Sequence, residues 1–107
     1  MLQVQGTNIS MIRGDTGTID VNISANGVPY QILDTDKIVF SVKKSYDTDA
    51  YAIQKTAEIG KIKLLHTDTN ELSTGNYVWD MQITTTDGDV ATIGPGKLKI
   101  LPDVTRE

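Results

Sequence analysis

Apolar and polar residues alternate along most of this chain, which is the pattern of β-strands with one buried face. The alternation is clearest over residues 76–85, where every second side chain is large and apolar. The apolar members of this segment are Tyr77, Trp79, Met81 and Ile83. The same period predicts strands at 18–24, 37–44 and 61–65, and less regular patterns predict strands at 8–12, 28–33, 51–56 and 90–101.

Turn residues separate these segments at short intervals. Asn26-Gly27 and Asp87-Gly88 are strong hairpin signals, because both turn positions tolerate a positive φ. Gly94-Pro95-Gly96 interrupts the last segment, and proline donates no hydrogen bond to a β-ladder. That strand is therefore predicted to be bulged or to lie at a sheet edge. Residues 67–72 carry the one helical signal, a single capped turn.

The spacing of the strands, together with one local motif, predicts the fold class. Seven or eight short strands at intervals of roughly 8–12 residues are typical of a β-sandwich or barrel. Leu72-x-x-Gly75-x-Tyr77 directly precedes the best strand and has the form of a tyrosine corner, whose phenol bonds to the backbone upstream. The chain is therefore predicted to be all-β, an immunoglobulin-like β-sandwich of seven to eight antiparallel strands. Residues 1–107 would form one domain, with Trp79 in its core.

Composition and charge narrow the function classes. The chain has 107 residues, 38% of them apolar and 22% charged. This apolar content is enough to form one hydrophobic core that is stable without a disulfide. It has no cysteine, which favours folding in a reducing cytoplasm. The net charge of −4 opposes binding to nucleic acid. No apolar run approaches the roughly 18 residues of a membrane span, and the N-terminus has no export signal pattern.

Several segments together resemble a known family. They are Arg13-Gly14-Asp15-Thr16, residues 37–44, Gly60-Lys61-Ile62, residues 75–82 and residues 96–105. This arrangement resembles the immunoglobulin-like N-terminal domain of upper-baseplate and related tail proteins, from phages and prophages of Gram-positive bacteria. The resemblance implies a β-sandwich that docks into a tail baseplate, often within a symmetric oligomer. It implies copies of itself or other tail proteins as partners, and location in the virion after synthesis in the host cytoplasm.

Enzymatic and metal chemistry have little support in the sequence. His66 is the only histidine, and no Gly-x-Ser-x-Gly elbow accompanies it, so no catalytic residues and no cofactor are predicted. One histidine without cysteine leaves too few ligands for a transition metal. Paired aspartates at 34/36, 47/49 and 87/89 leave calcium open, although aspartate is itself a favoured turn residue.

Binding through the surface is therefore the expected mode of action. Val39 interrupts the polar side of its strand, as expected where a strand lies centrally or contacts a partner. A non-enzymatic assembly protein of a phage tail or baseplate is favoured. The alternative is a carbohydrate-binding or adhesin-type immunoglobulin-like module. Its surface-binding loop would carry Tyr46 and Tyr51, because the core requires most of the other aromatic residues.

Overall fold

The computed structural model describes residues 2–5, 8–21, 23–25, 28–30, 32–33, 35–58 and 60–104. Within these residues the chain forms ten strands and one short helix. In chain order they are β1 (Gln3–Gln5), β2 (Asn8–Ile12), β3 (Gly17–Asp20), β4 (Ile23–Ala25), β5 (Val28–Tyr30), β6 (Lys37–Lys43), β7 (Ile53–Thr56), β8 (Lys61–Leu64), α1 (His66–Thr69), β9 (Gly75–Thr84) and β10 (Val90–Leu101). The fold is all-β, as the alternation predicted. No helix in the described ranges is long and apolar enough to cross a bilayer.

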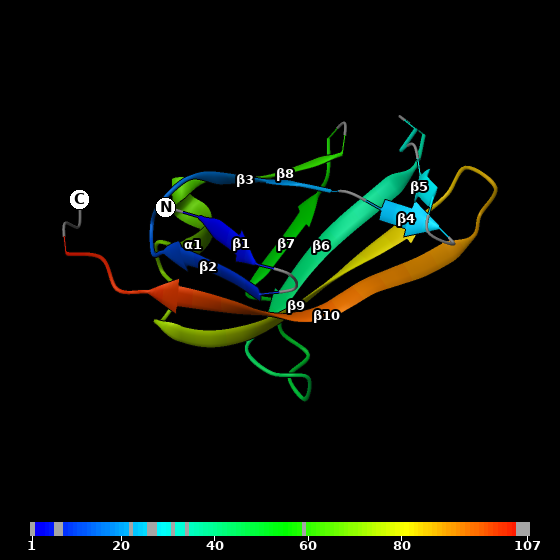
Figure 1. The fold of residues 1–107 in the computed structure, drawn as a ribbon. Coiled ribbons are helices and arrows are strands. Elements are labelled where there is room, and N and C mark those ends of the chain that lie inside the picture. The colour runs from blue at the N-terminus through cyan, green and yellow to red at the C-terminus, as the bar shows by residue number, and fades with distance from the viewer. Residues whose placement is uncertain are drawn as a thin grey trace.

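Six strands form one curled sheet, and a strand pair lies over one of its faces (Figure 1). The order in the sheet is β1-β2-β10-β9-β6-β7, and the covering pair is β3-β8. The hairpin of β4 and β5 stands at the end of the molecule where β9 turns back into β10. We call the side of the large sheet that faces β3 and β8 its inner face, and the opposite side its outer face.

One strand pairing differs from the expected antiparallel arrangement. Residues 8–12 of β2 pair in parallel with residues 97–101 of β10, so the sheet is mixed. The prediction of seven to eight antiparallel strands was therefore wrong in strand number and in the direction of this pair. The alternation of apolar residues shows which face of a strand is buried, but it is the same for both pairing directions.

The segment predicted as one strand at 18–24 is divided in two. β3 ends at Asp20, opposite Lys61 at the start of β8, and β4 begins at Ile23. The Val21 side chain is still buried, and its N–H donates to the carbonyl of Gly60 at 2.8 Å. Apolar alternation therefore continues past the point where the partner strand ends. The Asn26-Gly27 turn that was predicted to follow lies outside the described residues.

The Gly94-Pro95-Gly96 interruption is a β-bulge, as the sequence predicted. Ile93 lies opposite Met81, but Gly96 lies opposite Trp79, so β10 has one residue more than β9 between these pairs. The proline stands in the irregular part of the ladder, where its missing N–H does not break a regular hydrogen bond. Beyond the bulge, β10 continues between β9 and β2.

Among the side chains that the structure describes, sixteen buried apolar ones form the core between the inner face of the sheet and the β3-β8 pair. They are Ile9, Met11, Ile19, Val21, Ile38, Phe40, Val42, Ile53, Ile62, Leu64, Tyr77, Trp79, Met81, Ile83, Leu98 and Ile100. The alternate apolar residues predicted for β9 are all among them, and so are those of β6 and β8. At the centre, the Phe40 and Trp79 rings lie 5.7 Å apart at an interplanar angle of 43°. Tilted contact of this kind is a favourable aromatic geometry.

We predict that truncation of Trp79 severely destabilises the fold. Trp79 is 7% exposed and packs on Phe40, so Trp79→Ala would leave a large cavity and cost about 3–5 kcal/mol of unfolding free energy. Urea unfolding followed by circular dichroism measures this loss. Val104→Ala, at a fully exposed position, is the control and should leave the midpoint unchanged. Native tryptophan emission at the wavelength of indole in water would contradict a buried Trp79.

Candidate binding face of the six-stranded sheet

On the outer face of the sheet, three cross-strand rows of side chains from β6, β7 and β9 lie next to one another, and Lys37 and Thr84 form a fourth row at the end away from the β6–β7 loop. Pairing in the ladders fixes which residues share a row. The first row is Thr56, Val39 and Gln82; the second is Gln54, Ser41 and Asp80; the third is Lys43 and Val78. These residues alternate with the core residues along each strand. One set of side chains in each strand therefore points into the core, and the other set points to the outer face.

A groove of about 350 Å³ runs over these rows. Its floor consists of sheet residues, and Tyr46 and Tyr51 line it from the loop that joins β6 to β7. The full lining is Val39, Ser41, Lys43, Tyr46, Tyr51, Gln54, Val78, Trp79, Asp80 and Gln82. The structure therefore brings the two tyrosines of the predicted surface-binding loop next to the one valine, Val39, that broke the polar pattern of β6.

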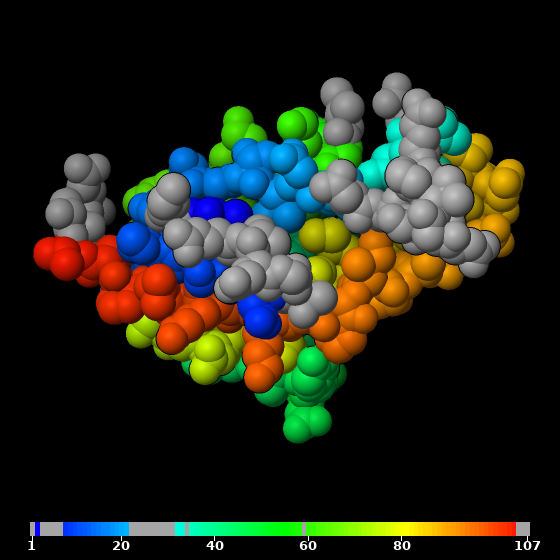
Figure 2. All heavy atoms as spheres, in the orientation of Figure 1, coloured from blue at the N-terminus to red at the C-terminus, as the bar shows by residue number. Residues whose placement is uncertain are grey.

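The β6–β7 loop, residues 44–52, projects from the outer side of the sheet, away from β3 and β8 (Figure 1). It forms the teal-green protrusion at the bottom of the space-filling view (Figure 2). The ladder holds its base, since the N–H of Ala52 donates to the carbonyl of Val42 at 2.7 Å. Lys44, the first residue of the loop, is also held in place. Its Nζ donates to Ser73 Oγ at 2.9 Å and lies 5.4 Å from the centre of the Tyr77 ring. The loop is thus tied to the sheet at both ends.

Tyr46 and Tyr51 differ in how they are held. The Lys43 ammonium lies 4.9 Å from the centre of the Tyr51 ring, a cation–π distance, and the ring remains half exposed. Tyr46 is 68% exposed and contacts no other described residue through a hydrogen bond or ring contact. An exposed ring of this size without a structural contact is available to a binding partner.

The floor of the groove combines free polar groups with a balanced charge. Asp80 and Gln82 are exposed, and neither side chain bonds to another described residue. Gln54 donates from its amide to Ser41 Oγ at 3.3 Å, which sets the orientation of that pair. Lys43 and Asp80 are the charged members of the lining, one of each sign. The groove can therefore donate and accept hydrogen bonds without a net charge of its own.

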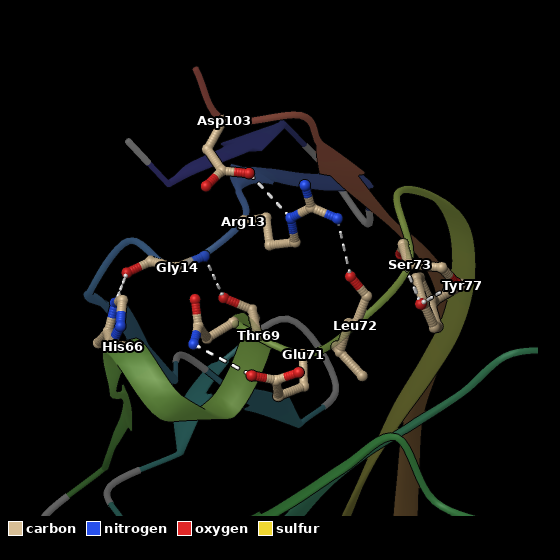
Figure 3. A network of polar contacts seen from close by, with 10 residues as sticks. Arg13, Gly14, His66, Thr69, Glu71, Leu72, Ser73, Tyr77 and Asp103 are labelled. Atoms are coloured by element: carbon tan, nitrogen blue, oxygen red, sulfur yellow. Dashed lines mark hydrogen bonds and ion pairs between the residues drawn. The ribbon is translucent and has the colours of Figure 1, made fainter. Parts of the chain in front are cut away.

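Leu72 and Tyr77 lie where α1 leads into β9 (Figure 3), and Gly75 is the first residue of β9. The Tyr77 hydroxyl donates to the carbonyl of Ser73 at 2.7 Å, four residues upstream, and lies 3.2 Å from Ser73 Oγ. Gly75 has a φ of +130°, a conformation that favours glycine, and Leu72 packs against the core. These residues lie where the chain passes from β8, in the covering pair, to β9, in the six-stranded sheet. The Tyr77 side chain is on the inner face of the sheet, whereas the groove is on the outer face.

An ion pair joins the segments that follow β2 and β10 in the same region, and the sequence did not predict it. Arg13 Nε donates to Asp103 Oδ1 at 2.8 Å, and Arg13 Nη1 donates to the Leu72 carbonyl at 3.4 Å (Figure 3). Both charged side chains are largely buried, with 22% and 11% exposed. No sequence signal pairs residues 90 positions apart. The pair forms because the parallel β2-β10 ladder ends at Ile12 and Leu101.

His66 has a structural contact in this region. Its Nδ1 donates to the Gly14 carbonyl at 2.7 Å, while the Gly14 N–H donates to the buried hydroxyl of Thr69 at 2.8 Å (Figure 3). These two bonds join the Arg13-Gly14-Asp15 turn to α1. Of the described acidic residues, Asp36 accepts from the backbone N–H groups of Leu33 and Thr86. No group of three or more His, Asp or Glu residues in the described ranges could hold a metal ion.

We predict that the Tyr77 hydroxyl stabilises the fold. Tyr77→Phe would leave the carbonyl of Ser73 without its partner and should cost about 1–3 kcal/mol of unfolding free energy. Tyr51→Phe is the matched control, since the Tyr51 hydroxyl bonds to no described residue. Denaturant titrations of both variants make the comparison. Equal midpoints for the two variants would show that the Ser73 bond contributes nothing.

No protein-family model matches the chain, and no curated protein matches it. The outer-face groove and the Tyr77 contacts therefore rest on the residues described above. The likeness to phage tail proteins stays a prediction from sequence motifs.

Proposed function

We propose that residues 1–107 form an immunoglobulin-like β-sandwich. The antiparallel order β10-β9-β6-β7, with β3-β8 as the facing layer, supports this assignment. It corresponds to strands G, F, C and C′ opposite strands B and E of an immunoglobulin domain. The Tyr77 bond to the Ser73 carbonyl, with Gly75 at a positive φ, supports a tyrosine corner at the start of strand F.

We further propose that the domain is a non-enzymatic structural protein of a phage tail or baseplate, which acts through contacts between protein chains. A free sheet edge at residues 90–93 of β10 is the observation that carries this proposal. These residues pair with β9 on one side, whereas β2 pairs with β10 only at residues 97–101. Among the described residues, the second side of 90–93 has no strand partner.

The chemistry of this edge suits pairing with another strand. Its sequence, Val90-Ala91-Thr92-Ile93, has no charge and includes three β-branched residues. Val90 is 59% exposed, and Ala91 and Thr92 are exposed as well. Proteins that act alone usually protect such an edge with lysine or proline. Here the bulge at Gly94 and Pro95 protects only the end of the segment.

A second copy of this chain is the proposed occupant of the edge. Two identical edges can pair antiparallel about a two-fold axis, so one segment supplies both halves of the contact. Such pairing would join two curled sheets into one continuous sheet. A stable interface buries about 1,200–2,000 Å² in total, so the contact must extend from the edge onto neighbouring side chains. In the virion, the resulting dimer would be the unit that docks on other tail proteins.

The outer-face groove favours a second function. Tyr46 and Tyr51 line it, and exposed aromatic rings beside free polar groups are suited to a carbohydrate-binding or adhesin-type module. The groove and the edge are separate surfaces, since none of residues 90–93 lines the groove. Assembly through the edge and ligand binding at the groove are therefore compatible in one domain.

We predict that the purified protein is a dimer in the micromolar range and that Val90→Lys makes it a monomer. The new ammonium group would lose hydration in a paired edge, and the contact would lose the valine side chain. Light scattering coupled to size exclusion gives the mass. Val104→Lys adds the same charge at a fully exposed position outside the edge and should remain dimeric.

A monomeric wild-type protein at all these concentrations would contradict self-assembly. A dimer that both lysine variants leave intact would exclude the β10 edge as its interface. Recovery of tail proteins with the wild-type domain from a virion lysate, lost in Val90→Lys, would support the tail assignment. Recovery of no tail protein would contradict it.

A further inference from the structure

We infer that the outer-face groove binds a neutral, pyranose-containing oligosaccharide, with Tyr46 and Tyr51 as its stacking platform. This inference rests on the second function proposed above and names its ligand class. It does not depend on assembly, because it uses a different surface. The groove opens on the outer face between β6, β7, β9 and the β6–β7 loop. Four features support the assignment: its size, its aromatic edge, its free polar groups and its charge.

The groove has a volume suited to a short oligosaccharide. Its volume of about 350 Å³ is near the lower end of the range of small-ligand sites, which is roughly 300–1,000 Å³. It is formed by a paired sheet and a loop tied at both ends, so most of its shape exists before a ligand arrives. A preformed site loses little conformational entropy when a ligand binds.

The two tyrosines provide the apolar part of the site. A pyranose ring presents C–H groups on one side, and an aromatic face covers them while the sugar hydroxyls stay free to bond at the rim. Tyr46 is 68% exposed and makes no hydrogen bond or ring contact with the described residues. The Lys43 ammonium lies 4.9 Å from the centre of the Tyr51 ring, which orients that ring, and the Tyr51 side chain stays half exposed.

The polar side chains of the floor suit a ligand rich in hydroxyl groups. A hydroxyl donates one hydrogen bond and accepts others, so it can bond both to a carboxylate and to an amide. Asp80 supplies an acceptor, and Gln82 supplies a donor and an acceptor. Neither is engaged by another described residue, and both lie on β9 two residues apart, on the same face. A sugar spanning this spacing would satisfy both.

The charges and the apolar pattern favour a neutral sugar over a protein partner. Lys43 and Asp80 balance each other within the lining, so the groove offers no net attraction to a charged ligand. Val39 and Val78 are half-buried, and they lie in different rows, separated by the row of Ser41 and Asp80. A protein interface usually has a continuous apolar centre. Here the apolar contact is divided into small patches, as suits a ligand that alternates C–H faces with hydroxyls.

The test uses the whole 107-residue chain and defined trisaccharides of glucose, galactose and N-acetylglucosamine as probes. Amide resonances are followed by two-dimensional NMR as each probe is added at millimolar concentrations. We expect at least one probe to shift the resonances of Ser41, Asp80 and Gln82, while those of β3 and β8 stay unchanged. Sialyllactose and a proline-rich peptide are added in parallel as a charged sugar and as a peptide ligand.

Substitutions then separate the groove from the rest of the surface. Tyr46→Ala should lower the affinity for the trisaccharide that binds about tenfold, and Gln82→Ala should lower it severalfold. Leu65→Ala removes an exposed apolar side chain outside the groove lining and should bind like the wild type. Val90→Lys should also bind normally, even where it abolishes dimers, so loss of assembly and loss of sugar binding are distinguishable. Unchanged tryptophan emission shows that each variant is folded.

Three outcomes would overturn the inference. The first is that none of the neutral trisaccharides shifts the groove resonances. The second is that a probe binds but Tyr46→Ala and Leu65→Ala bind it equally well. The third is that only sialyllactose or the peptide binds at the groove, which would replace the neutral sugar with a charged ligand or a protein segment.

Discussion

The packing of β9 is the constraint on which the rest of this structure depends. β9 pairs with β6 on one side and β10 on the other, and its inward side chains place Trp79 against Phe40 at the centre of the core. Because strand side chains alternate, fixing Tyr77, Trp79 and Met81 inward also fixes Val78, Asp80 and Gln82 outward. The orientation of β9 therefore determines both which side chains enter the core and which side chains line the groove. A shift of one residue in the register would move polar side chains into the core and destroy both surfaces together.

The two proposed surfaces arise from irregular features at the borders of this regular sheet. The bulge after Ile93 separates the part of β10 that pairs with β2 from the part that keeps a free edge. The loop that joins β6 to the edge strand β7 places Tyr46 and Tyr51 in the lining of the groove. Neither Tyr46 nor Tyr51 of the loop, and neither Gly94 nor Pro95 of the bulge, belongs to the core. A domain built in this way could assemble through one border and bind a ligand near the other, while the same buried residues stabilise both.

Contacts between distant segments hold the end of the molecule where the chain crosses between layers. The Arg13–Asp103 pair joins the ends of β2 and β10, and the Gly14 backbone bonds to both His66 and Thr69 (Figure 3). The Tyr77 hydroxyl adds a further bond to the Ser73 carbonyl. Partly buried ion pairs and bonds to backbone groups cost more to break than they contribute when formed, because each leaves an unpaired polar group behind. The loss of any one of these contacts would therefore destabilise this end of the fold.

The sequence alone determined most of the strands and their buried faces, since alternation with period two marks both directly. It marked neither β1 nor the division of 18–24 into β3 and β4. It also marked the bulge, through Pro95 between two glycines, and the helical turn before β9, although that turn begins one residue earlier than predicted. It singled out Tyr46 and Tyr51 as free aromatic residues, but not the residues that form the groove with them. Only the tertiary structure decided that β2 and β10 run parallel, that Arg13 meets Asp103, and that Gln54, Asp80 and Gln82 form one surface with the tyrosines. The physical reason is that periodicity is a property of one strand. Pairing direction and register depend on the partner strand, and on burial that only the assembled sheet provides.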